Sequence, residues 1–241
     1  MIRDRLIEWA RRYNTRSFIN DDPVQFVHKF QDPRDIEIAG FLVSWISWGK
    51  RSMILNKGNF LMAIMQGKPY DFLMYEEHKR FKGRQEKIYR IFSYDDLYKL
   101  CESMRLVYEG FGSMGNKIRV YKNCRYDLAI RQMFGHCNGV PSIFSKSAAK
   151  RVNMFLRWMI RKDSVDVGVW GDFLNKRNLL IPVDTHVLQM ALTLGITDQV
   201  IANEKAMLQI TKYFKAIFPS DPCMGDFALF GYGVNNTKIE R

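Results

Sequence analysis

Hydrophobic residues recur every three or four positions along most of this chain, which is the spacing of one face of an α-helix. The pattern predicts helices over residues 3–13, 50–65, 93–108, 127–133, 146–162, 184–195, 204–218 and 226–233. A further helix is predicted from Asp32-Pro33 to Gly49, because aspartate followed by proline is typical of a helix start. Ser93 and Asp96 have the spacing of a capping box. No set of alternating segments indicates a β-sheet, so the predicted class is all-α.

The segment 146–162 has the most uneven distribution of charge, since it contains no acidic residue. At about 100° per residue, four of its six cations fall in one narrow sector, and Val152, Phe155, Leu156 and Met159 fall on the other side. The cations in that sector are Lys146, Lys150, Arg157 and Arg161. Such a face is either a solvated surface or a surface that binds anions.

Composition indicates a folded, basic protein. The chain has 241 residues, 47% of them hydrophobic, and a net charge of +12. This charge favours nucleic acid as a partner, with an anionic membrane surface or no polyanionic partner as the alternatives. The most apolar stretch, 38–48, is too short to span a bilayer, and the N-terminus does not resemble a signal peptide.

The four cysteines are Cys101, Cys124, Cys137 and Cys223, which are far apart and form no CxxC pair. Their spacing argues against a zinc site or an iron–sulfur cluster built from them, and it gives no disulfide framework. The sequence therefore predicts a reducing, cytoplasmic setting and no metal site.

Two short strings carry the candidate chemistry, KRVNMFL at 150–156 and IPVDTHV at 181–187. The first places Lys150 at the start of a helix, and the second places Asp184 at a helix N-cap. Covalent catalysis on a nucleotide needs at least two groups. One is an amine that attacks a sugar carbon, and the other is a carboxylate that directs the proton and stabilises the developing charge. We therefore take Lys150 and Asp184 as the candidate catalytic pair.

These strings resemble the helix–hairpin–helix DNA glycosylase superfamily, the group of endonuclease III and the 8-oxoguanine DNA glycosylases. In that family a lysine follows the hairpin and begins a helix, often with an asparagine three residues later, which here is Asn153. The family aspartate lies in a VDTH-like string, which matches Asp184. Residues 44–57 resemble the helix–loop–helix whose loop inserts into the duplex, and residues 226–233 resemble the closing helix.

The chain departs from the family pattern in its hairpin, where VPSIFS at 140–145 replaces the usual pair of glycines. The spacing from Lys150 to Asp184 is 184 − 150 = 34, longer than in endonuclease III and similar to archaeal-type 8-oxoguanine glycosylases. The iron–sulfur cysteines of endonuclease III are absent. The chain is also similar to a bacterial family of unassigned function in this superfamily.

The resemblance implies an all-α, two-lobed fold, with one lobe at 35–139 and the other formed by 1–34 and 140–241. It implies a base-excision DNA repair enzyme, a glycosylase and AP lyase that flips out a damaged base and removes it through a Schiff base on Lys150. An oxidised purine such as 8-oxoguanine is the expected lesion. The implied partner is double-stranded DNA, with no cofactor, metal, iron–sulfur cluster or membrane, for a monomer in the cytoplasm at the nucleoid.

Several side chains are candidates for contact with DNA. Trp48 precedes Gly49, Lys50 and Arg51, a combination that suits insertion into a duplex, and Phe144 lies in the hairpin-like segment, where it could stack on a base. Phosphate contacts are expected at Lys50, Arg51, Lys146, Arg151, Arg157 and Arg161. The other tryptophans considered, Trp45, Trp158 and Trp170, are more typical of a hydrophobic core.

Three other functions fit the same features. The first is a DNA-binding protein that keeps the fold without the chemistry, and the second is an enzyme that processes RNA or nucleotides on the same scaffold. The third is a helical protein of a membrane surface. Only the glycosylase/lyase requires a covalent adduct at Lys150.

Overall fold

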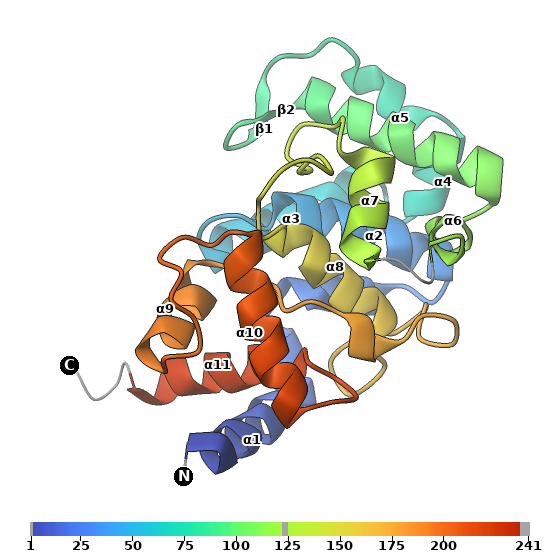
Figure 1. Ribbon diagram of the computed structural model, residues 1–241. Coiled ribbons are helices and arrows are strands. Elements are labelled where there is room, and N and C mark those ends of the chain that lie inside the picture. Colours follow the sequence, from blue (N-terminus) through green and yellow to red (C-terminus); the bar gives the residue numbers. More distant parts are fainter. Residues whose placement is uncertain (1, 122–124, 237–241) are drawn as a thin grey trace. The chain divides into compact units, whose positions relative to one another are not determined.

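The computed structural model describes residues 2–121 and 125–236, and it is mostly helical, which confirms the predicted all-α class (Figure 1). The α-helices are α1 (Ile2–Tyr13), α2 (Pro33–Ile46), α3 (Arg51–Ile64), α4 (Pro69–Met74), α5 (Tyr94–Phe111), α6 (Met114–Arg119), α7 (Tyr126–Phe134), α8 (Lys150–Ile160), α9 (Thr185–Thr193), α10 (Glu204–Ile217) and α11 (Met224–Asn236). Short 3-10 helices lie at Arg16–Asp21, Pro23–Lys29, Glu77–Phe81 and Lys176–Asn178. A small antiparallel hairpin, β1 (Lys87–Tyr89) and β2 (Phe92–Ser93), was not predicted.

The chain divides into two compact units. Unit 1 comprises Met1–Asn20 with Phe144–Arg241, and unit 2 comprises Asp21–Ile143. The predicted boundaries were at residues 34/35 and 139/140, so unit 2 begins earlier and ends slightly later than predicted. The reason is that the 3-10 helix at Pro23–Lys29 packs on α2 and α3 and thereby belongs to the same unit.

Unit 2 is built around α2, whose side chains are nearly all buried. Asp32 caps this helix as predicted, because its carboxylate accepts a hydrogen bond of 2.8 Å from the Arg34 backbone N–H. Glu37 is a buried carboxylate inside α2. It accepts hydrogen bonds from the Tyr108 hydroxyl at 2.6 Å and from the Met114 N–H at 2.9 Å, at the start of α6. These bonds offset the cost of burying the charge and fasten α5 and α6 to the central helix.

The predicted capping box is present at the start of α5, where Ser93 and Asp96 exchange hydrogen bonds between side chain and backbone. On the same helix, the Glu102 carboxylate is hydrogen-bonded to Arg105 at 2.7 Å and to the buried His78 ring at 2.8 Å. The Arg105 guanidinium first, and then His78, lower the pKa of Glu102 to about 2, from an ordinary 4.5.

This shifted pKa predicts an acid-dependent component of stability. Because the folded-state pKa of Glu102 is lower than the unfolded one, its contribution is complete above about pH 5 and is lost as the pH falls toward 2. We expect wild type to lose roughly 2 kcal/mol more unfolding free energy than Glu102→Gln between about pH 6 and pH 3. Urea unfolding at both pH values measures this difference. Glu77→Gln is the control, since the Glu77 side chain is 37% exposed and lies 3.7 Å from Arg80; equal pH slopes for wild type and Glu102→Gln would contradict the assignment.

In unit 1, α1 packs against α11, so the first and last described helices are in contact although they are far apart in sequence. Trp9 meets Tyr232 edge to face with ring centroids 5.5 Å apart. Gly231 allows this close approach, because a Cβ at that position would lie 2.6 Å from the Tyr13 ring. A hydrophobic cluster runs from these helices to α9 and α10 and includes Ala148 and Val183, which precede the two candidate catalytic residues.

Candidate active site

Lys150 is the first residue of α8, as predicted. The chain enters this helix through Ala149, whose φ of 46° and ψ of 41° are left-handed. This conformation is strained for a residue with a side chain and costs on the order of 1–3 kcal/mol. No side chain caps the helix, and the Lys150 side chain is half-buried. The sharp turn therefore places the lysine at the positive end of α8.

Asn153 fixes this turn in place. It is buried, and its amide donates a hydrogen bond of 3.0 Å to the Ala148 carbonyl, just before the strained residue. The same amide lies 3.1 Å from the Met207 sulfur, on α10. The asparagine that the family resemblance pairs with the lysine therefore anchors the start of α8 in this chain.

Asp184 caps α9, which confirms the predicted N-cap. Its Oδ1 accepts hydrogen bonds from the backbone N–H groups of His186 at 3.0 Å and Val187 at 2.9 Å. Among the described residues, its Oδ2 has no hydrogen-bond partner, and the side chain is half-buried. One carboxylate oxygen thus orients the group, and the other stays available for a ligand or for a proton.

Helix α10 supports the segments that carry both residues. Met207 contacts Asn153 of α8, and the Thr211 hydroxyl, one turn further, accepts the Ile181 N–H at 3.1 Å. Positions four apart lie on the same face of a helix. Adjacent turns of one face of α10 therefore hold the start of α8 and the segment that leads to Asp184. No sequence signal indicated this role for α10, since Met207 and Thr211 are ordinary helix residues.

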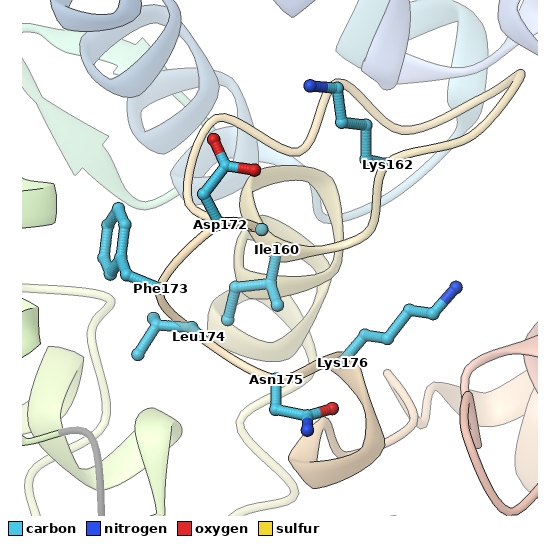
Figure 2. A pocket seen from close by; sticks show the side chains of 8 residues that line it. Ile160, Lys162, Asp172, Phe173, Leu174, Asn175 and Lys176 are labelled. Carbon is cyan, nitrogen blue, oxygen red and sulfur yellow. The ribbon is translucent and has the colours of Figure 1, made fainter.

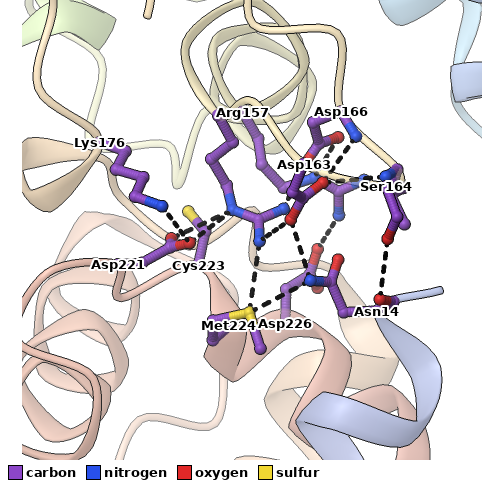
Figure 3. A network of polar contacts seen from close by, with 12 residues as sticks. Asn14, Arg157, Asp163, Ser164, Asp166, Lys176, Asp221, Cys223, Met224 and Asp226 are labelled. Atoms are coloured by element: carbon purple, nitrogen blue, oxygen red, sulfur yellow. Dashed lines mark hydrogen bonds and ion pairs between the residues drawn. The ribbon is translucent and has the colours of Figure 1, made fainter.

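The basic face predicted for residues 146–162 is not present in the structure. The helix begins only at Lys150, and Arg157 and Arg161 are 3% and 1% exposed. Figure 3 shows the network of polar contacts that surrounds Arg157. The two guanidinium groups form ion pairs with Asp163, Asp166, Asp221 and Asp226. Buried and neutralised by these carboxylates, Arg157 and Arg161 cannot bind phosphate, so that prediction is wrong for both.

Asp166 is the acid that both arginines of this network share, so we expect its substitution to destabilise the protein strongly. It is buried and pairs with Arg157 at 3.3 Å and also with Arg161. Replacing one partner of a buried ion pair costs about 3 kcal/mol. For Asp166→Asn we expect the melting temperature to fall by about 6–12 °C in a calorimetric scan. Asp172→Asn, an exposed aspartate of the same segment, is the control; a similar melting temperature for both variants would contradict the role given to the network.

The remaining predicted DNA contacts are accessible or partly so. Phe144 is 85% exposed, and Lys146 is exposed and lies 3.8 Å from Glu204. Arg151 is half-buried, and burial lowers its pKa to about 10. In unit 2, Trp48 is exposed, as are Lys50 and Arg51. Trp45, Trp158 and Trp170 are buried, which confirms the core positions expected for them.

A pocket of about 490 Å³ in unit 1 lies at the far end of α8 from Lys150 (Figure 2). Its lining includes Ile160 at the end of that helix and Lys162, Phe173 and Lys176 beyond it. Since α8 has 11 residues and rises about 1.5 Å per residue, roughly 15 Å separates this pocket from the lysine. The pocket is therefore separate from the candidate pair.

These features define a mostly helical protein whose candidate chemistry lies on Lys150 and Asp184 of one unit. The chain belongs to the family described as Protein of unknown function (DUF2400), whose model matches residues 22–235. No curated protein and no solved structure matches the chain. Within residues 2–121 and 125–236, no helix is long and apolar enough to cross a membrane, and no group of three His, Cys, Asp or Glu side chains could hold a metal ion. Cys124 lies outside the described residues.

Proposed function

We propose that this protein is a DNA glycosylase with AP lyase activity on a helix–hairpin–helix glycosylase fold, whose two lobes are units 1 and 2. The observation that carries the proposal is the support of Lys150 and Asp184 by one face of α10. The lysine follows a strained left-handed residue, and the aspartate keeps one carboxylate oxygen without a partner among the described residues. A nucleophile and its assisting carboxylate must be held in fixed positions, and this shared support favours that role for the pair.

The proposed reaction begins with a damaged nucleotide that is turned out of the duplex. The Lys150 amine attacks C1′ of the sugar, and the N-glycosidic bond breaks, so that the base leaves with the bonding electrons. The Asp184 carboxylate stabilises the positive charge that develops on the sugar and accepts a proton from the lysine nitrogen. The proton on Asp184 then moves to O4′ as the sugar ring opens, which gives a Schiff base at C1′. The departed base, which left as an anion, accepts a proton from C2′, and the 3′-phosphate leaves by β-elimination.

Charge supports duplex DNA as the substrate. The chain has a net charge of +12, and it exposes Lys50, Arg51 and Lys146. These cations, with the partly buried Arg151, are the proposed phosphate contacts. Phe144 is the proposed stacking residue of unit 1, and an oxidised purine such as 8-oxoguanine is the proposed lesion.

Borohydride trapping of the full-length protein tests this proposal. The substrates are a duplex that contains one 8-oxoguanine, a duplex that contains one abasic site, and an undamaged duplex. We expect borohydride to reduce the Schiff base to a stable protein–DNA adduct with either damaged duplex, and peptide mapping to find the DNA on Lys150. Tight binding to DNA without any adduct would favour a DNA-binding protein without this chemistry. Adducts or strand breaks with RNA alone would favour an RNA-processing enzyme.

A further inference from the structure

A groove of about 550 Å³ lies in unit 1 along the outer face of α10. Its lining includes Glu204, Leu208 and Lys212, which are four residues apart and therefore share one face of the helix. Met207 and Thr211 are buried on the inner face, where they support the segments that carry the candidate catalytic pair. This α10 groove is thus separate from that pair, and the proposed reaction does not use it.

Hydrogen bonds to neighbouring segments fix the shape of the α10 groove. At the start of the helix, the Glu204 N–H donates a hydrogen bond of 2.8 Å to the Lys146 carbonyl. One turn further, the Gln209 side chain accepts a hydrogen bond from the Thr197 hydroxyl, in the loop before α10. Lys146 and Gln209 both line the groove. Because its walls are held in this way, little ordering entropy is lost when a ligand binds.

The two ends of the α10 groove differ in charge. At one end, the Lys146 ammonium lies 3.8 Å from the Glu204 carboxylate, so these two charges largely offset each other. At the other end, Lys212 is exposed and has no ion-pair partner within residues 2–121 and 125–236. Lys205 also lines the groove, which gives the lining three lysines and one glutamate, a charge of 3 − 1 = +2. The groove is therefore electrostatically complementary to an acidic ligand.

The middle of the α10 groove is apolar. Leu208 lies between the two charged ends and is 41% exposed. In the loop before α10, Val200 and Ile201 are still more exposed, and they lie within three residues of Asn203, which lines the groove. A phosphate backbone gains nothing from such a surface, whereas an apolar side chain of a peptide removes it from water. The exposed apolar side chains therefore favour a peptide over a nucleic acid as the acidic ligand.

We propose that the α10 groove binds an extended acidic segment of a partner protein. One apolar side chain of the segment packs on Leu208, and neighbouring carboxylates pair with Lys205 and Lys212. The helix rises about 12 Å from residue 204 to residue 212, a length that about four extended residues span. This inference does not rest on the proposed function, and it requires no reaction at Lys150.

Fluorescence anisotropy of a labelled peptide, measured with the full-length protein, tests the α10 groove. The probe peptide has four aspartates followed by leucine and phenylalanine. One comparison peptide has asparagine in place of each aspartate, and the other has serine in place of both apolar residues. We expect the probe to bind with a Kd on the order of 10–100 µM, and both comparison peptides to bind at least about tenfold more weakly. Absence of probe binding at about 1 mM protein would overturn the assignment.

Two variants locate the binding site. Leu208→Gln removes the apolar contact and Lys212→Gln removes the cation, and glutamine is a good helix former in both places. We expect the probe to bind about tenfold more weakly to Leu208→Gln and about threefold to tenfold more weakly to Lys212→Gln.

Each variant has a matched control. Leu106→Gln changes a leucine of α5 that is 56% exposed, and Lys215→Gln changes an exposed lysine of α10 that does not line the groove. We expect both controls to bind the probe within about twofold of wild type. Equal losses in a variant and its control, with melting temperatures that show all four proteins to be folded, would overturn the assignment of the site.

Other occupants of the α10 groove give different results. Weaker binding of an undamaged duplex to Leu208→Gln and Lys212→Gln, with no competition from the probe peptide, would assign the groove to DNA and overturn the peptide. A dimer in sedimentation that Leu208→Gln dissociates would assign it to a second copy of the chain, with the same consequence. Borohydride trapping is independent of these results. Peptide binding without an adduct retains the groove and loses the lyase, and an adduct without peptide binding does the reverse.

Discussion

Lys150→Gln is expected to abolish the borohydride adduct, with a loss of at least about 10³-fold in the rate of trapping. Glutamine keeps much of the length and polarity of lysine but has no nucleophilic amine. The substitution leaves the anchor at Asn153 in place, because that side chain bonds to the Ala148 carbonyl and not to the lysine. Circular dichroism should therefore show an unchanged helix content.

Two other lysines serve as controls for this variant. Lys146 and Lys162 flank α8, and their conversion to glutamine removes the same charge. We expect adduct formation by both to fall by less than about tenfold, as expected for weakened phosphate attraction. An adduct of normal yield in Lys150→Gln, mapped to a different lysine, would show that the nucleophile had been assigned wrongly.

Asp184→Asn is expected to slow base release by about 10²–10⁴-fold with little change in stability. Asparagine is as good an N-cap as aspartate, so the amide oxygen can accept the same N–H groups of His186 and Val187. What the variant loses is the negative charge that stabilises the sugar cation and the ability to accept a proton. Single-turnover release of 8-oxoguanine, measured beside thermal unfolding, separates the two effects.

Asp184→Ala completes this test. It removes both the charge and the cap, so it is expected to be as slow as Asp184→Asn and less stable by about 1 kcal/mol. If Asp184→Asn released the base at the wild-type rate, Asp184 would be a helix cap without a catalytic role. The two variants thus separate a catalytic role of the Asp184 carboxylate from its role as a helix cap.

The sequence predicted features that depend on a few neighbouring residues. The N-caps at Asp32 and Asp184 and the capping box at Ser93 occur in the structure, and Lys150 begins α8, although that helix was predicted from residue 146. Each of these depends on hydrogen bonds or backbone preferences within about one turn, so the residues that determine them are adjacent in the chain. The position of both candidate catalytic residues at helix starts could therefore be predicted.

Features that depend on residues outside the helix could not be predicted in the same way. The cations Arg157 and Arg161 were placed on an exposed face because the helix itself contains no acid. Their partners lie in the loop that follows, at Asp163 and Asp166, and far along the chain, at Asp221. A helical projection contains no information on such segments. The small hairpin was missed for a different reason, since strands of three and two residues are too short to show an alternating pattern.

The pairing of α1 with α11 has a consequence for how the chain is made. Unit 2 lies between these helices in sequence, so α1 leaves the ribosome long before its partner is synthesised. Until then Leu6 and Ala10, which are buried in the finished structure, lack that neighbour. Residues 21–143 have no such delay, because the contacts within that unit come from one continuous stretch. We expect unit 2 to fold during synthesis, and unit 1 to fold only once the last helix has been translated, as the long sequence separation between α1 and α11 requires.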